Sequence, residues 1–272
     1  AAPLLRRRMC RSKQFIMRLW LRRGNDVLTP SQVESFRRDG QLIVPDLFGA
    51  ELIDRAQADL AQWDAEFRAT LTDEERQWYL EDPTDPASPF RKLDNPVFHR
   101  NAFRELAITP ALVEAVEQLI GAGVSVLFSQ VFCKAPEVGG PKPVHQDNFY
   151  FAPDDPEALL TTWIALDAAT EENGCLHYGN GSHREPVLEH AAPKEEPFNL
   201  QVPEEVAAKY PMAPAPVPRG GVSIHHGNTL HQSSSNRSDH PRRAVTFHFL
   251  RNEARLVNPA LEYDPTHSVR IS

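Results

Sequence analysis

Long hydrophobic runs are missing from this sequence of 272 residues. No apolar stretch approaches the roughly 20 residues that a helix needs to cross a bilayer, so we expect no membrane partner. An excess of basic residues is missing too: the formal net charge is -8, which argues against a nucleic-acid binder. Cysteine is scarce, and Cys10, Cys133 and Cys175 form neither a disulfide framework nor a Cys-x-x-Cys zinc site. These absences predict a soluble protein of a reducing, cytoplasmic compartment.

Acidic residues are absent before Asp26, whereas arginine is frequent there. An Arg-rich, acid-poor segment has the composition of an organellar transit peptide. A flexible basic arm, or upstream sequence outside the functional domain, fits the same composition. We therefore separate residues 1–26 as a basic N-terminal extension and treat residues 27–272 as one domain, because barrels and sandwiches reach this size undivided.

The N-terminal part of that domain, residues 27–123, is predicted to be mainly helical. Thr29-Pro30-Ser31-Gln32 is a helix start with an N-cap, a proline in the first turn and a capping-box glutamine. This helix should end at Gly40, before a short strand over residues 41–44. Apolar residues at helical spacing predict further helices at about 51–67 and 110–120. The polar, proline-containing stretch 72–91 is predicted to be a loop near an opening.

From residue 124 onward the pattern changes to short β-rich segments between turns rich in Gly, Pro and Asn. Several such strands in succession indicate an all-β sandwich or barrel. We predict a mostly β protein with flanking helices, whose core is a double-stranded β-helix (a cupin-like jelly roll) over about 124–251, with a pocket between its two sheets. The expected strands are residues 124–132, 159–166, 175–178, 222–226 and 244–250.

A metal site is suggested by His145-Gln146-Asp147. In an extended segment, side chains two positions apart point to the same face. A second histidine, with His231 as the best candidate, would complete the two-histidine, one-carboxylate set of non-heme Fe(II) oxygenases. By composition His225 and His226 are rivals. Alone the motif is weak, because roughly one such triplet is expected by chance among 11 histidines.

The joint pattern of several segments is far more specific. In order and spacing, these segments strongly resemble the phytanoyl-CoA dioxygenase family of Fe(II)/2-oxoglutarate oxygenases, over about residues 28–250. The segments are QVFCKAP from Gln130, HQDNFY from His145, TWIALDAATEENGCL from Thr162, GSH from Gly181, HQSSSNRS from His231, and Arg242.

The resemblance implies roles for individual residues. His145, Asp147 and His231 would bind iron, since the family places its last ligand five residues beyond His226. Arg242 would pair with the far carboxylate of 2-oxoglutarate, and a planar guanidinium suits that task because it can donate two parallel hydrogen bonds. The neighbouring Arg243 must then face the opposite side of its strand.

Further family positions fall on residues around the co-substrate. Ser233 would donate its hydroxyl to the carboxylate that Arg242 binds, and Gln130, Trp163 and Lys92 would line the pocket. Trp163 could equally be a core aromatic and Lys92 a solvated charge, whereas Gln130 needs a hydrogen-bond partner if buried. We interpret Asn173-Gly174 as a turn and Asn236 as structural. Many relatives have His-Gly-Ser-Gly where this chain has His231-Gln232-Ser233-Ser234, which puts substrate identity in doubt rather than cofactor binding.

The implied reaction uses Fe(II), 2-oxoglutarate and O2 to hydroxylate a C–H bond of a small or medium-sized metabolite, with succinate and CO2 as co-products. Asp147 favours hydroxylation or desaturation, because relatives that halogenate have a small residue there. Two alternatives stay open: a zinc-dependent hydrolase with the same triad, and a jelly-roll binding protein without turnover. We expect loops 72–91 and 184–218 to select the substrate; the sequence does not determine the oligomeric state.

Overall fold

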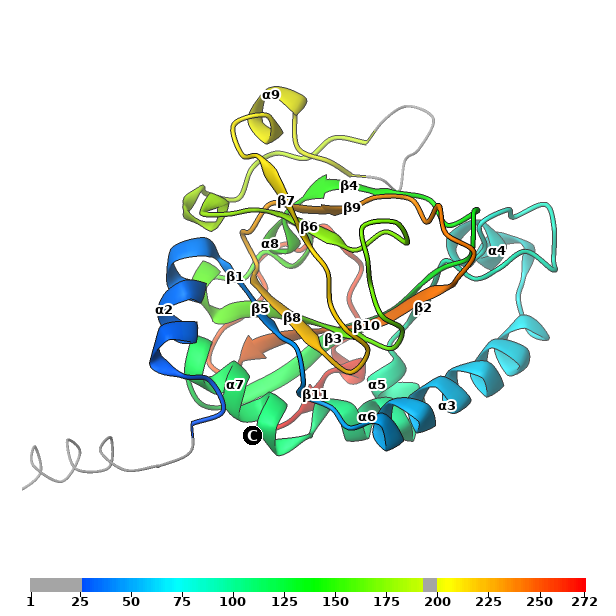
Figure 1. Cartoon of the computed structure of the whole chain (residues 1–272), viewed down its shortest axis with the longest axis horizontal. Helices are drawn as coiled ribbons and strands as arrows, with labels where there is room; N and C mark the ends of the chain where they lie inside the picture. Colours follow the sequence, from blue (N-terminus) through cyan, green and yellow to red (C-terminus); the bar gives the residue numbers. More distant parts are fainter. Residues whose placement is uncertain (1–25, 193–199) are drawn as a thin grey trace, which may run out of the picture.

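The computed structural model describes residues 26–192 and 200–272, so the predicted basic extension lies almost wholly outside the described residues. Two antiparallel sheets form the centre (Figure 1). The larger sheet has the order β1-β8-β5-β10-β3-β11, with β2 also paired to β3, and the smaller has the order β4-β9-β6-β7. Their bounds are β1 Gln41–Val44, β2 Lys92–Asp94, β3 Val124–Lys134, β4 Lys142–His145, β5 Leu159–Ala165, β6 Leu176–Gly179, β7 Met212–Ala215, β8 Val222–His226, β9 His231–Ser233, β10 Arg242–Arg251 and β11 Val269–Arg270.

The inner faces of the two sheets pack against each other. Trp163 of β5 and Ala244 of β10 share one buried cluster with Tyr178 of β6 and Ala215 of β7. The other face of the larger sheet is covered as well, and every residue of β5 is buried. A strand buried on both faces needs side chains that tolerate burial on either side, which explains its continuous LLTTWIA sequence. The predicted jelly-roll core with flanking helices is confirmed.

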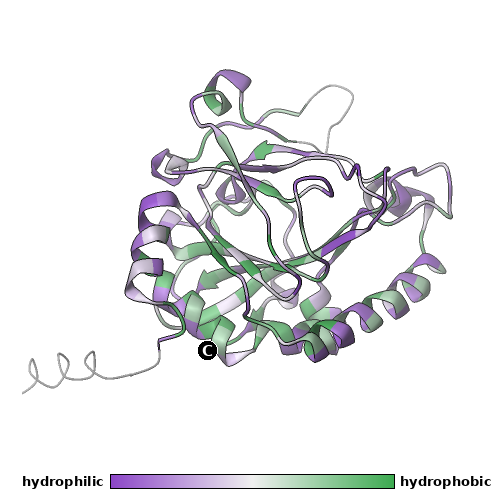
Figure 2. Cartoon of the chain, in the orientation of Figure 1, coloured by the Kyte–Doolittle hydropathy of each residue, from purple (hydrophilic) through white to green (hydrophobic). Residues whose placement is uncertain are grey.

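Helices cover the outer face of the larger sheet, opposite the smaller sheet (Figure 1). The capping box of Thr29 and Gln32 starts the first of them, and Gly40, at φ 77°, ends it in the left-handed region. Apolar sides of the helices turn toward the sheet, as the alternating colours along α3 show in Figure 2. The covering helices are α2 Pro30–Asp39, α3 Ala50–Arg68, α5 Pro96–His99, α6 Asn101–Ala107 and α7 Pro110–Ile120.

Part of the predicted loop 72–91 is helical instead, so that prediction was wrong for α4 (Asp73–Tyr79). Thr72 and Glu75 form a capping box there, and this local signal outweighs the polar composition. The strands β2, β7, β9 and β11 were not predicted, and each has only two to four residues. The strand β4 is the extended segment expected at His145, although it ends at that residue. The remaining short elements are α8 Asp147–Phe151, α9 Glu204–Ala207, η1 Pro156–Ala158, η2 Ser182–Arg184 and η3 Pro265–His267.

The N-terminal part supplies strands as well as helices. β1 pairs with β8 and β2 pairs with β3, so both extend the larger sheet. Within residues 26–192 and 200–272, no helix is both long and apolar enough to cross a membrane.

Candidate metal centre

Two neighbouring strands of the smaller sheet bring the two predicted histidine ligands together. His145 ends β4, His231 begins β9, and the two residues are direct partners in the antiparallel register. Asp147 is not on the strand, contrary to the prediction, because the chain turns into α8 at this residue. Backbone hydrogen bonding of the next residue, Asn148, to the carbonyl of Gly227 holds that turn. The carboxylate therefore approaches the histidines from the first turn of a short helix.

The three side chains converge on one point. One ligand atom from each of His145, Asp147 and His231 lies within 4.8 Å of the other two. Each histidine Nε2 is 3.7 Å from Oδ1 of Asp147, and the two imidazole centroids are 4.1 Å apart. All three residues are buried, with exposed fractions of 7%, 5% and 4%. This donor set and spacing suit a divalent metal ion bound by two imidazoles and one carboxylate.

Backbone carbonyls fix the orientation of both imidazoles. Nδ1 of His145 donates to the carbonyl of Pro143 at 2.8 Å, and Nδ1 of His231 donates to that of Thr229 at 2.9 Å. Each Nε2 lone pair therefore faces the centre. A metal-bound histidine usually donates its other ring N–H to a carbonyl or carboxylate, as both of these do. Burial lowers the pKa of both imidazoles, that of His145 well below its ordinary value. Both rings are thus neutral at pH 7, as metal binding requires.

A buried hydrogen-bond network fixes the other oxygen of Asp147. Oδ2 accepts from the Thr161 hydroxyl at 2.5 Å and from Nε2 of His225 at 3.0 Å. Nδ1 of His248 lies 2.8 Å from the Thr161 oxygen and donates to it, because that hydroxyl already gives its proton to Asp147. By the same logic, Nδ1 of His225 accepts from the Tyr178 hydroxyl at 2.9 Å. Oδ1 is left free for a metal.

The same network determines the ionisation of Asp147. Burial by itself would raise the pKa of this carboxyl. The neighbouring His231 and the hydrogen bond from His225 outweigh burial and hold the pKa well below its ordinary value. The site therefore presents a carboxylate and two neutral imidazoles before any metal arrives, and the residues fit the metal that the sequence predicted.

The two rival histidines lie outside this donor set. His225 is close to the centre, but its Nε2 donates to Asp147 and so cannot bind a metal in that state. His226 points to the opposite face of β8, where its Nε2 is 3.3 Å from Glu157. Sequence reasoning did not identify the network around Asp147. It did not single out Thr161 or His248, and it considered His225 only as a rival metal ligand. Thr161 and His225 each adjoin a second polar residue of the same strand, and His248 lies two residues from Thr246, so no pattern along the strands singles them out.

Arg242 is buried, and no carboxylate of residues 26–192 and 200–272 forms an ion pair with it. Its exposed fraction is 2%, and among the described residues Nε and Nη1 have no hydrogen-bond partner. The guanidinium carbon lies 5.4 Å from the ring centre of Trp163, which is two residues from Thr161 on the same face of β5. Burial lowers the pKa of Arg242 to about 10, so it stays charged at pH 7. A buried, unpaired cation is costly unless a ligand neutralises it, so Arg242 indicates an anion-binding position.

Arg243 faces the other way, as predicted. Its Nε and Nη2 donate to the two carboxylate oxygens of Asp167, at 2.7 and 2.8 Å. Asn236 has the predicted structural part, because its amide nitrogen donates to the carbonyls of Lys134 and His240.

Ser233 is buried on β9, two residues beyond His231 and on the same face. The Lys134 amine donates to the Ser234 carbonyl and, at 3.5 Å, to that of Ser233. Lys134 is the register partner of Arg242 and is 6% exposed. Burial, followed by the charge of Arg242, lowers the pKa of Lys134 to about 6. Sequence reasoning did not single out Lys134.

Gln130 and Lys92 meet at Asp94. The Gln130 amide donates to Oδ1 at 2.8 Å, and the Lys92 ammonium is 3.1 Å from Oδ2. Lys92 also lies 5.5 Å from the ring centres of Trp78 and Tyr79. Gln130 thus has the partner that its burial requires, and Lys92 is an ion-paired residue rather than a freely solvated one.

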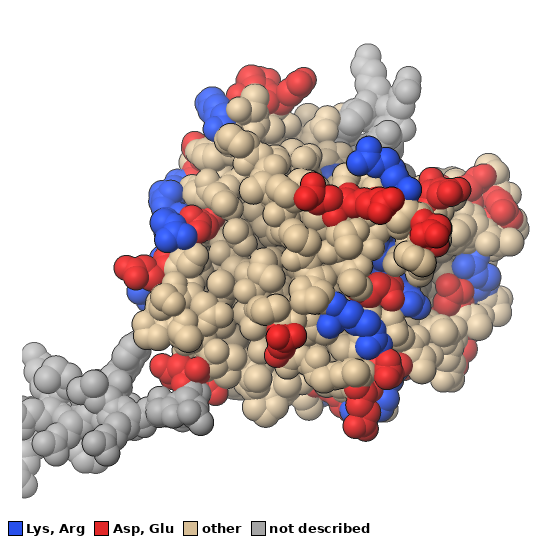
Figure 3. All heavy atoms as spheres, viewed as in Figure 1, with Lys and Arg blue, Asp and Glu red and all other residues tan. Residues whose placement is uncertain are grey.

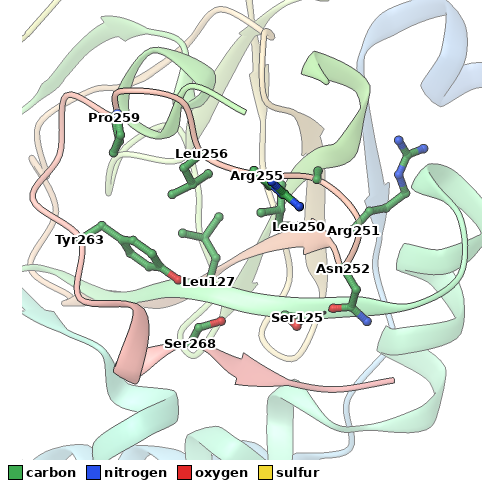
Figure 4. Close-up of a pocket in the computed structure, with 11 residues that line it drawn as sticks. Ser125, Leu127, Leu250, Arg251, Asn252, Arg255, Leu256, Pro259, Tyr263 and Ser268 are labelled. Atoms are coloured by element: carbon green, nitrogen blue, oxygen red, sulfur yellow. Dashed lines mark hydrogen bonds between the residues drawn. The ribbon is translucent and has the colours of Figure 1, made fainter. Parts of the chain in front are cut away.

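Surface features point away from other candidates. A cavity of about 450 Å³ lies beside Leu127, Leu250 and Tyr263 and contains none of the predicted site residues (Figure 4). On the face shown in Figure 3, acidic and basic side chains are interspersed around a largely uncharged centre, so that face has no large basic patch.

The comparisons with known proteins agree with this geometry. The family model described as Phytanoyl-CoA dioxygenase (PhyH) matches residues 36–244. A mouse protein, phytanoyl-CoA dioxygenase domain-containing protein 1, is 27% identical over 88% of this chain and 96% of its own length. Among solved structures, EctD from S. alaskensis with bound Fe has a TM-score of 0.71 at 21% identity, covering 89% of this chain and 83% of that one. The alpha-ketoglutarate-dependent carbocyclase SnoK has a TM-score of 0.70 at 21% identity, over 90% and 97%. At such identities the structural likeness shows the fold.

Proposed function

Because the chain belongs to the phytanoyl-CoA dioxygenase family, we propose that it is an Fe(II)- and 2-oxoglutarate-dependent dioxygenase that hydroxylates a C–H bond of a small or medium-sized metabolite. The observation that carries this proposal is the combination of two features between the sheets. One is the buried donor set of His145, Asp147 and His231. The other is Arg242, a buried guanidinium without a protein counter-ion. The first suits a metal ion, and the second suits a carboxylate ligand.

The chain's own residues supply position and exclusion of water. His145 and His231 would present Nε2, and Asp147 would present Oδ1, to one side of the metal. Three donors on one side leave the opposite coordination positions for exogenous ligands. When bound, iron and 2-oxoglutarate supply the oxidising chemistry with O2, and the protein supplies binding and orientation.

The far carboxylate of 2-oxoglutarate would bind Arg242. The guanidinium can donate to it, since Nε and Nη1 have no hydrogen-bond partner in the described part of the chain. Ser233 would add its hydroxyl, and the Trp163 indole would pack against the bound molecule and the guanidinium. Burial on this scale keeps bulk water away from the reacting atoms and strengthens each electrostatic contact.

A zinc-dependent hydrolase is the second candidate, because the same three ligands suit zinc. Arg242 argues against it, since a metal-activated water needs no carboxylate clamp. Turnover separates the two: incubation with 2-oxoglutarate under air should release succinate when Fe(II) is added and should not when Zn(II) is added. Hydrolysis supported by zinc, with no consumption of O2, would overturn the proposal.

The hydroxylation itself needs a substrate screen. Library compounds that raise succinate release above the uncoupled background would be treated with 18O2 and their products analysed by mass spectrometry. We expect the product to gain one oxygen atom derived from O2. A product that loses two hydrogens and gains no oxygen would identify a desaturase instead. His231→Ala is the matched inactive control in both assays.

A further inference from the structure

Lys142 is a second cation near the metal centre that the proposed function does not use. It lies on β4, three residues before His145, and is partly buried. Its Nζ is 3.5 Å from the Tyr150 hydroxyl and 5.6 Å from the centre of the Tyr150 ring. The Tyr150 ring in turn lies 5.8 Å from the imidazole of His145. The ammonium group therefore lies beside the metal ligands, against an aromatic residue of α8.

Lys142 has no ion-pair partner among the described residues, although the more distant Asp147 carboxylate attracts its charge. Within residues 26–192 and 200–272, no carboxylate lies within ion-pair distance of its Nζ, whereas the nearby Lys92 is paired with Asp94. Burial, followed by the charge of Lys92, lowers the pKa of Lys142 to about 8, so most molecules carry this charge at pH 7. Keeping a partly desolvated ammonium without an anion costs free energy, which an anionic ligand would recover.

The ammonium group lies on the side of the metal ligands. Its charge affects the pKa values of His145 and His231, and that of His190 on the neighbouring loop. His190 stacks on Phe149 with the ring centres 4.1 Å apart. Arg242 has different surroundings: the Trp163 ring, the thiols of Cys133 and Cys175, and the carboxylate of Asp167. The two cations thus have different neighbours, and Lys142 is also the register partner of Ser233.

We propose that Lys142 binds a carboxylate of the primary substrate, so that this charged group lies beside Tyr150. This inference depends on the proposed function in one respect only, namely that the ligand of Lys142 is called a substrate. A charge-assisted hydrogen bond to a carboxylate contributes about 1.5–3 kcal/mol, which corresponds to roughly 10- to 100-fold in affinity.

The test measures binding without iron or 2-oxoglutarate, so failure of turnover and failure of this inference are distinguishable. The probes are straight-chain, branched and aromatic monocarboxylates, each paired with its primary amide, which has the same shape without the charge. Lysines would be labelled by reductive 13C-methylation, and the Lys142 resonance identified by its absence in Lys142→Gln. We expect at least one acid to shift that resonance and to bind roughly 10-fold or more tighter than its amide.

Matched variants complete the design. Lys142→Gln should lose the preference for acid over amide, Lys142→Arg should retain it, and exposed Lys209→Gln should behave like the parent. Thermal unfolding of each variant checks that it is folded. The inference is wrong if every acid binds no better than its amide, or if Lys142→Gln keeps the preference. It is also overturned if Lys142→Gln weakens binding of 2-oxoglutarate, because the lysine then serves the co-substrate.

Discussion

Thr161→Val tests whether the hydrogen-bond network around Asp147 prepares the metal site. The substitution keeps the β-branched shape but removes the hydroxyl that donates to Oδ2 of Asp147 and accepts from Nδ1 of His248. A lost hydrogen bond to a charged group costs about 1.5–3 kcal/mol, and an orphaned buried donor costs about 1–3 kcal/mol more. Because the two losses are not additive in one network, we expect the free energy of unfolding of the metal-free protein to fall by about 2–5 kcal/mol.

Metal affinity should fall as well. Asp147 would keep only the hydrogen bond from His225, so its carboxylate could rotate and Oδ1 would no longer be fixed toward the two imidazoles. Loss of such a supporting contact typically lowers metal affinity by about 10- to 100-fold. Urea unfolding of the metal-free protein gives the first quantity, and competition with a chromophoric chelator for Zn(II) gives the second.

Thr162→Val is the matched control. Thr162 is the next residue on β5 and is equally buried, but it faces the opposite side, where its hydroxyl lies 3.5 Å from the Phe247 carbonyl. We expect a change below about 1 kcal/mol in stability, because that contact is too long to contribute much. Equal effects of the two substitutions on zinc affinity would refute the reasoning, since the network around Asp147 would then have no special part in binding.

Three further perturbations address the charged residues. Arg242→Met removes a buried unpaired cation, so the free energy of unfolding without ligand should rise. The same variant should bind 2-oxoglutarate at least about 100-fold more weakly, as measured by calorimetry. Arg243→Met breaks the pair with Asp167, so it should lower the free energy of unfolding and leave 2-oxoglutarate binding intact. In the folded protein the pKa of Lys134 is about 6, below its value in the unfolded chain. Between about pH 6 and pH 10 the unfolded chain therefore binds one more proton than the folded protein. The free energy of unfolding should then rise with pH by up to about 1.4 kcal/mol per pH unit. Lys134→Met should flatten that rise in urea titrations at successive pH values. Zn(II) should raise the unfolding midpoint and a chelator should reverse the shift, except in His231→Ala.

Sequence alone predicts elements whose signals are local. Thr29 and Gly40 bound α2 as predicted, since a capping box and a C-terminal glycine need no tertiary partner. The turn into α8 could not be predicted, because five residues carry no periodicity and the helix depends on contact with Gly227. The helix α4 was missed because composition was given more weight than the capping box at Thr72.

The residues of the candidate site likewise fall into those that the sequence predicts and those that only the fold reveals. The triad and Arg242 were expected from the family resemblance, which depends on segments in a fixed order and spacing, and the fold brings the triad together. Lys134 and Lys142 carry no such spacing, and each is noteworthy only because the fold buries it near other cations. Burial of a lysine depends on residues distant in sequence, so no pattern along the chain reveals it.

The donor and acceptor roles in the hydrogen-bond network explain why the site around Asp147 favours a metal ion over a proton. Thr161 and His225 both donate to Oδ2 of Asp147, and each has its own acceptor side occupied, by His248 and Tyr178 respectively. A proton on Oδ2 would have no acceptor and would break one of these bonds. A proton on Oδ1 would compete with a cation at the point where both Nε2 lone pairs also converge. The polarity of the network therefore keeps Asp147 ionised and leaves a divalent cation as the ligand that satisfies all three donors at once.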